Sequence, residues 1–163
     1  MQIIELETKI AAPLERCFLL SLSLDLEMKV TKPARVRAIA GRTHGVIGPG
    51  ETVTWRGRHL GVMMITHQSL ITQYEKPHHF QDAMVRGVFR SFVHDHFFAA
   101  CGEGTVMRDR LAFAAPLAPL GWLAERLVLR AYLTNLLKHR NEMIRQVAEA
   151  DESMWAPFVE RSA

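Results

Sequence analysis

The chain has 163 residues, of which 48% are hydrophobic, and a formal net charge of +3. This length and composition suit one globular domain, residues 1–163, with a substantial core. Basic and acidic residues are interleaved without a Lys/Arg block, which argues against nucleic-acid binding. Neither an apolar signal segment nor an uninterrupted apolar stretch of membrane-spanning length is present, and Cys17 and Cys101 have no metal-type spacing. We therefore expect a cytoplasmic protein with no integral membrane association.

The N-terminal part of the chain mixes strand and helix signals. Residues Gln2 to Ile10 alternate apolar and polar side chains, which indicates a first strand. Pro13 suits the first turn of a helix that runs from Leu14 to about Leu22. Residues Leu20 to Met28 alternate again, and this period alone favours another strand.

The middle of the chain predicts a series of strands separated by glycine and proline. A strand over Ala34 to Thr43 is followed by the glycine-rich loop Gly45 to Gly50. This loop lacks the Lys-Ser/Thr pair of a phosphate-binding P-loop, so we interpret it as a turn. Antiparallel strands are expected next over Glu51–Arg58, His59–Tyr74 and His79–Arg86.

The last third of the chain predicts a hairpin that leads into one long helix. Strands over Arg90–Phe98 and Val106–Phe113 are joined through the turn Cys101–Gly104. A helix is expected from about residues 118–121 to about Glu149. Its first part is apolar over a wide arc and should be covered on two sides, whereas its second part carries only a narrow apolar stripe.

A histidine pair in this hairpin is the main candidate for a site. In a strand, His94 and His96 point to the same face. If the hairpin closes on Gly102-Glu103 in a type II′ turn, His96 lies opposite Asp109 and His94 lies opposite Leu111. A three-residue loop would reverse the parity and separate the histidines from Asp109.

Three interpretations of this cluster compete. It is a hydrogen-bonded polar group inside a sheet, or a polar anchor for a ligand head group in an apolar cavity. The third is a metal site, completed by His59, His67 or Asp109. Because the sequence singles out no third ligand, the metal interpretation ranks last, and we predict no metal and no other cofactor.

Several local strings, taken in order, resemble the START-like superfamily, also called the SRPBCC or helix-grip fold. The resemblance is closest to its small bacterial ligand-binding or polyketide-cyclase-like members and covers nearly the whole chain. It implies an α+β fold in which a curved antiparallel sheet wraps a long C-terminal helix, with two short helices after the first strand and a cavity for apolar ligands. It also favours helix or turn over residues 20–28. The strings are Ala12–Phe18, Gly50–Trp55, Pro77–Asp82, His94–Phe97, Gly104–Asp109 and Pro116–Gly121.

The expected function is binding of a small hydrophobic or amphipathic ligand between the sheet and the C-terminal helix. One alternative is a cyclase/aromatase-like or other lyase-type enzyme that moves protons with His94, His96 and Asp109. Another is a protein-interaction module whose cavity is filled by its own side chains. No residue is assigned a catalytic role, and the oligomeric state is not indicated. The predicted ligand-binding residues are Arg90, Phe92, His94, His96, Phe98, Met107, Asp109, Leu111, Phe113, Leu129, Leu133 and Leu136.

Overall fold

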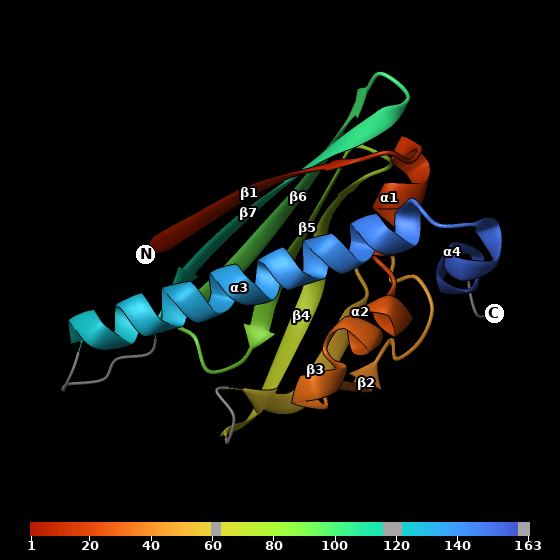
Figure 1. Cartoon of the computed structure of the whole chain (residues 1–163). Coiled ribbons are helices and arrows are strands. Elements are labelled where there is room, and N and C mark those ends of the chain that lie inside the picture. The colour runs from red at the N-terminus through yellow and green to blue at the C-terminus, as the bar shows by residue number, and fades with distance from the viewer. Residues whose placement is uncertain (60–62, 116–121, 160–163) are drawn as a thin grey trace.

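The computed structural model describes residues 1–59, 63–115 and 122–159, and in this part of the chain a seven-stranded antiparallel sheet curves around one long helix (Figure 1). The strand order is β1-β7-β6-β5-β4-β3-β2, so the first and last strands of the chain are neighbours. The helix-grip architecture expected from the sequence is therefore confirmed. The strands are β1 (Gln2–Ile10), β2 (Arg37–Gly41), β3 (Thr52–His59), β4 (Met63–Glu75), β5 (His79–Arg86), β6 (Ser91–Cys101) and β7 (Gly104–Ala114).

The helices lie on one side of the sheet. The long helix α3 crosses the strands, and α1 and α2 flank its C-terminal half (Figure 1). No described helix combines the length and the apolar character that a membrane crossing requires. The helical elements are α1 (Leu14–Ser21), α2 (Leu24–Val30), the 3₁₀ turn η1 (Lys32–Ala34), α3 (Trp122–Ala148) and α4 (Glu152–Val159).

The segment from Leu20 to Met28 is helical, although its alternation favours a strand. The hydroxyl of Ser23 accepts a hydrogen bond from the backbone N–H of Leu26 at 3.3 Å and so caps the start of α2. The leucines at alternate positions are buried because α1 ends and α2 begins between them. This local cap agrees with the two short helices that the family resemblance implies.

The hairpin of β6 and β7 has the predicted register. Cys101 pairs with Gly104, which places His96 opposite Asp109 and His94 opposite Leu111. Gly102 has a φ of +59°, as the first central residue of a type II′ turn requires. The predicted two-residue loop, which brings the histidines and Asp109 to one face of the sheet, is thus confirmed.

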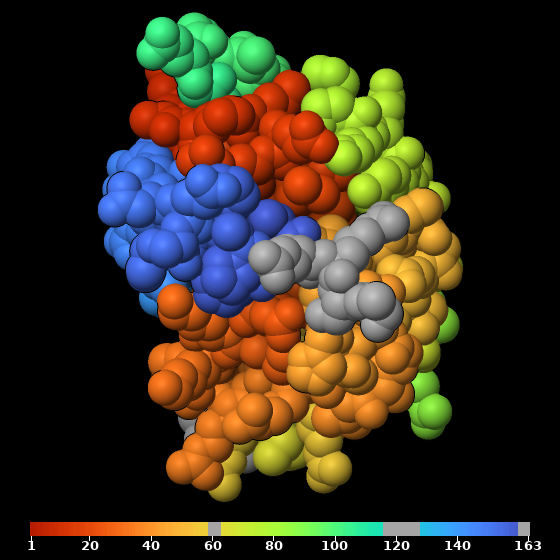
Figure 2. All heavy atoms as spheres, turned by 90° about the vertical axis from the view of Figure 1, so that its right-hand side faces the viewer, coloured from red at the N-terminus to blue at the C-terminus, as the bar shows by residue number. Residues whose placement is uncertain are grey.

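One end of the space between helices and sheet is filled by an aromatic cluster. The ring of Phe18 from α1 lies 5.4 Å from those of Tyr74 and Phe98 and 5.6 Å from that of Phe80, centroid to centroid. Outside it, α4 packs on α1, where the guanidinium of Arg16 lies 4.3 Å from the ring centroid of Trp155. Figure 2 shows α4 and the end of α3 in blue beside α1 in red at this end of the molecule.

Candidate ligand-binding cavity

A cavity of about 730 Å³ lies between the sheet and α3, lined mainly by apolar side chains. Leu129, Leu133 and Leu136 are spaced so that one face of α3 presents all three to it. The cavity continues between β3, β4 and β5, where Val53, Ile71 and Phe80 line it. Of the predicted ligand-binding residues, it is lined by Phe92, His94, His96, Leu111, Leu129, Leu133 and Leu136.

The other five predicted residues do not line the cavity. Arg90 is exposed just before β6. Phe98 and Met107 lie opposite each other beneath α1, where Phe18 and Ser21 fill the space. Phe113 packs in a second core cluster, and Asp109 lies behind the two histidines. Strand alternation predicts which face a side chain occupies, but not where along the strand the helices fill the space.

A polar cluster of two histidines and two aspartates forms one part of the cavity wall. The imidazoles of His94 and His96 lie 3.7 Å apart, centroid to centroid. His94 Nε2 is hydrogen-bonded to Asp109 Oδ1 at 3.0 Å, and His96 Nε2 to Asp82 Oδ1 at 3.2 Å. His96 Nδ1 lies 2.8 Å from Asp109 Oδ1, but outside hydrogen-bond geometry. The histidines are thus held between a carboxylate that lines the cavity, Asp82, and one behind them, Asp109.

The long helix supports this cluster from behind with two adjacent polar residues. Asn141 Nδ2 donates to Asp109 Oδ2 at 2.7 Å and lies 3.2 Å from Thr8 Oγ1. The Arg140 guanidinium binds Glu27 at 3.1 Å and also lies 3.8 Å from Asp109 Oδ1. Asp109, which is only 1% exposed, therefore has partners on the sheet and on the helix.

The surroundings lower the pKa values of both aspartates and of His94, and they raise the pKa of His96. Burial would raise the pKa of Asp109, but the hydrogen bond from His94 and the close approach of the His96 ring hold it well below its usual value. Burial would raise the pKa of Asp82 too, but its hydrogen bond to His96 and the charges of His94, His96 and Arg140 together lower it. Burial and the charge of His96 lower the pKa of His94. Burial would also lower the pKa of His96, but its interactions with Asp109 and Asp82 raise it.

The protonation pattern leaves a neutral imidazole facing the cavity. With its pKa lowered, His94 donates from Nε2 to Asp109, so that Nδ1 carries the lone pair. Within the described residues Nδ1 makes no hydrogen bond; its nearest charged neighbour is Asp82 Oδ1 at 4.0 Å. Together Asp82, His94 and His96 offer carboxylate and imidazole atoms to a polar group, a proton or a metal ion.

Asp82, Arg140 and Asn141 are not among the residues predicted for the site. Asp82 pairs across β5 and β6 with His94, and it closes the string Pro77–Asp82 on which the family resemblance rests. Its placement beside the histidines depends on the register between those two strands. The placement of the two helix residues depends on the rotation of α3 about its axis.

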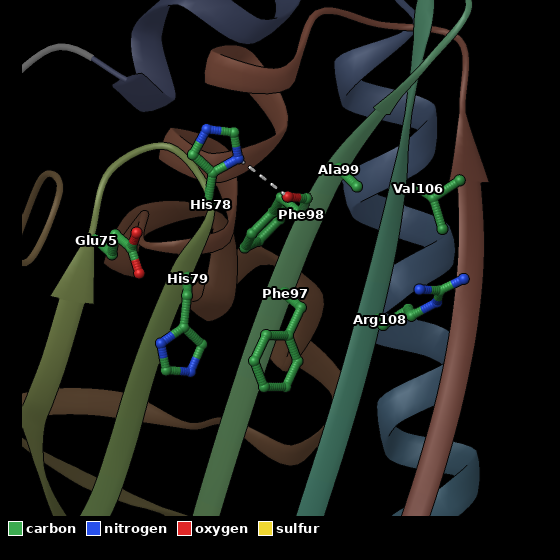
Figure 3. Close-up of a pocket in the computed structure, with 8 residues that line it drawn as sticks. All are labelled: Glu75, His78, His79, Phe97, Phe98, Ala99, Val106 and Arg108. Carbon is green, nitrogen blue, oxygen red and sulfur yellow. Dashed lines mark hydrogen bonds between the residues drawn. The ribbon is translucent and has the colours of Figure 1, made fainter.

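The opposite face of the same strands has a shallower hollow of about 330 Å³ (Figure 3). Figure 3 shows His79 and Phe97 side by side there, with the ribbon of α3 behind the strands; their rings stack at 4.5 Å. Nε2 of His79 is already bound to Asp95 Oδ1 at 3.2 Å, and Gln81 donates to the same oxygen at 2.7 Å. Asp95 thus faces away from the cavity, as the strand period predicts.

Comparisons with known proteins define the class of fold. No family model and no curated protein matches the chain. Among solved structures, the Zhui aromatase/cyclase from Streptomyces sp. R1128 superposes with a TM-score of 0.73 at 14% identity, covering 91% of this chain and 93% of that one. TTHA0849 from Thermus thermophilus gives 0.69 at 19% identity, with 88% and 97% covered. Major latex-like protein 151 from Panax ginseng gives 0.64 at 12% identity, with 91% and 98% covered. The chain therefore shares with these proteins the fold in which a curved antiparallel sheet grips a long C-terminal helix.

Proposed function

We propose that this protein binds a small, mainly apolar molecule with one polar end in the cavity between the sheet and α3. The observation that carries the proposal is a large cavity whose wall is mainly apolar and which has the cluster of Asp82, His94 and His96 in one part of that wall. Such a cavity favours a ligand by apolar burial and orients it by a few polar contacts. A ligand that buries about 300 Å² of apolar surface gains roughly 7 kcal/mol from burial, before the cost of immobilisation.

Exposed apolar residues on the cavity wall mark its entrance. Met63, Val88 and Val128 line the cavity, yet 53%, 40% and 59% of their surfaces remain exposed. They belong to β4, the connection between β5 and β6, and the first half of α3. This opening lies away from the end that Phe18 and α4 fill. The apolar part of the ligand enters here, and its polar end reaches His94 and His96.

Filling the cavity with a larger side chain tests this proposal. Leu136 lines the cavity, whereas the preceding residue, Asn135, is exposed on the same helix. Leu136→Trp should therefore weaken the binding of a fluorescent fatty acid by about tenfold or more, or about 1.4 kcal/mol. Asn135→Trp adds the same ring outside the cavity and should leave the affinity unchanged. Equal affinities in both variants, or no binding by the unmodified protein at ligand concentrations below micelle formation, would refute the proposal.

A second candidate function is a cyclase-like or other lyase-type reaction inside the same cavity. The favouring observation is the arrangement in which Asp109 holds Nε2–H of His94 while Nδ1 remains available to take a proton. Likeness in fold to an aromatase/cyclase adds a precedent but not an activity. Incubation with a poly-β-ketone analogue, followed by mass spectrometry, separates the two functions. Loss of water from the analogue that depends on His94 supports the enzyme, and recovery of unchanged analogue supports binding alone.

A further inference from the structure

We propose that Asp82, His94 and His96 bind a divalent first-row transition metal ion, with zinc as the first candidate, at the polar end of the cavity. Each residue offers one ligand atom, and these atoms lie within 4.8 Å of one another. The expectation of no metal rested on the lack of a third ligand in the sequence, and Asp82 supplies one. The site needs no organic ligand, so it stands or falls independently of the binding function proposed above.

The donor set and its spacing fit such an ion. Two imidazole nitrogens and one carboxylate oxygen suit zinc and its neighbours rather than magnesium or calcium, which prefer oxygen ligands. Zinc bonds of about 2.0 to 2.2 Å place tetrahedral ligand atoms about 3.3 Å apart. Asp82 Oδ1 lies 3.2 Å from His96 Nε2 and 4.0 Å from His94 Nδ1, so small side-chain rotations suffice. Three protein ligands leave one position open toward the cavity.

Asp109 supplies the outer support that histidine ligands usually have. Metal-binding histidines commonly donate their second ring N–H to a carboxylate, which fixes the tautomer and the ring orientation. Asp109 Oδ1 lies 3.0 Å from His94 Nε2 and 2.8 Å from His96 Nδ1. A bound ion would take the opposite ring nitrogens, Nδ1 of His94 and Nε2 of His96, which lie near Asp82 Oδ1, and would replace the hydrogen bond between His96 and Asp82. Asn141 holds the other oxygen of Asp109 in place at 2.7 Å.

The local charge also favours a divalent cation. Among the described residues, the carboxylates of Glu27, Asp82 and Asp109 and the guanidinium of Arg140 lie at the two histidines. Asp82 and Asp109 contact the histidines directly, and Glu27 pairs with Arg140 beside them. A divalent ion bound by the histidines and Asp82 would be stabilised by these carboxylates in a site that is largely removed from water.

Metal titration of protein stripped with a chelator and purified without an affinity tag tests the site. Zinc should bind at one ion per chain, measured by competition with a chromophoric chelator. Asp82→Asn and His96→Gln each remove a ligand and should weaken binding by more than the roughly 10- to 100-fold typical of a lost outer hydrogen bond. His79→Gln and Asp95→Asn remove a similar pair from the opposite face of β5 and β6 and should keep the original affinity.

Two further measurements separate metal binding from folding. Zinc should raise the melting temperature of the unmodified protein but not that of His94→Gln. This variant also removes a ligand, and it replaces Asp82→Asn in the test if Asp82→Asn does not fold. Asp109→Asn should keep the stoichiometry and weaken binding about 10- to 100-fold, because it acts on the ligands and not on the ion. Binding well below one ion per chain, or equal affinity in the ligand variants and the outer-face controls, overturns the proposal.

Discussion

Replacing Asp109 by leucine would remove a buried carboxylate while leaving its partners in place. Asp109 is 1% exposed and accepts hydrogen bonds from His94 at 3.0 Å and from Asn141 at 2.7 Å. After Asp109→Leu, Nε2–H of His94 faces a methyl group, and Asn141 keeps only Thr8 as a partner among the described residues. Both donors then remain desolvated without regaining their bonds, and this destabilises the folded state.

The expected loss follows from these two bonds. A hydrogen bond to a charged group contributes about 1.5 to 3 kcal/mol, and removal of one partner of a buried charged cluster costs about 3 to 5 kcal/mol. We expect Asp109→Leu to lower the free energy of unfolding by about 3 to 5 kcal/mol, a large share of the roughly 5 to 15 kcal/mol typical of a domain. Urea denaturation with a metal chelator present measures this loss without any contribution from bound ions.

Asp109→Asn is the matched comparison because it keeps the shape and one acceptor. Asn141 Oδ1 has no hydrogen-bond partner among the described residues, so its amide is free to turn and accept a hydrogen bond from the introduced carboxamide. We expect this variant to lose about 1 to 2 kcal/mol, mainly because its hydrogen bond to His94 is no longer charge-assisted. A leucine variant that is as stable as the asparagine variant would refute the reasoning.

Three further predictions concern the rest of the fold. Burial raises the pKa of Cys17, so iodoacetamide should label the exposed Cys101 in the native protein and Cys17 only after denaturation, as peptide mass spectrometry would show. Phe18→Ala should lower the free energy of unfolding by about 3 to 5 kcal/mol, whereas Phe97→Ala on the exposed face should cost far less; similar losses in urea would contradict the core assignment. Gly104→Ala should lower the melting temperature, because its Cβ would lie 2.5 Å from a backbone oxygen of β1; an unchanged melting curve would count against this packing.

The hairpin of β6 and β7 shows which part of the site is accessible from the sequence. Its register depends on the two residues of the turn, and glycine at the first of them favours the positive φ of a type II′ turn. Once the turn is set, the period of two places His94, His96 and Asp109 on one face. Every step of that inference uses residues close together in the chain.

The position of Asp82 beside the histidines cannot be predicted from residues close to it in the chain. The pairing of β5 with β6 ends at Ala83 and Val93, so no tight turn fixes their register. The pairing of β4 with β5 is irregular at two points, so the alternation of side chains cannot be carried from β4 to β5 either. The third ligand of the proposed metal site therefore depends on the sheet as a whole. For this reason the sequence leaves the structural, ligand-anchoring and metal interpretations of the histidines open.

The sequence does indicate that α3 contributes polar residues to the site. Leu129, Leu133 and Leu136 are predicted to face the cavity, and Arg140 follows Leu136 by four residues, which continues the same stripe. Asn141 likewise stands four residues after the buried Leu137. A charged residue and an amide within an apolar stripe must find polar partners inside the fold, because burial without them is costly. Asn141 donates a hydrogen bond to Asp109 on the facing strand β7, whereas Arg140 donates to Glu27 of α2 and to the backbone oxygen of Ser21 and lies 3.8 Å from Asp109. The sheet and the helix therefore each carry part of one polar centre, and Asp109 is the residue that joins the two parts.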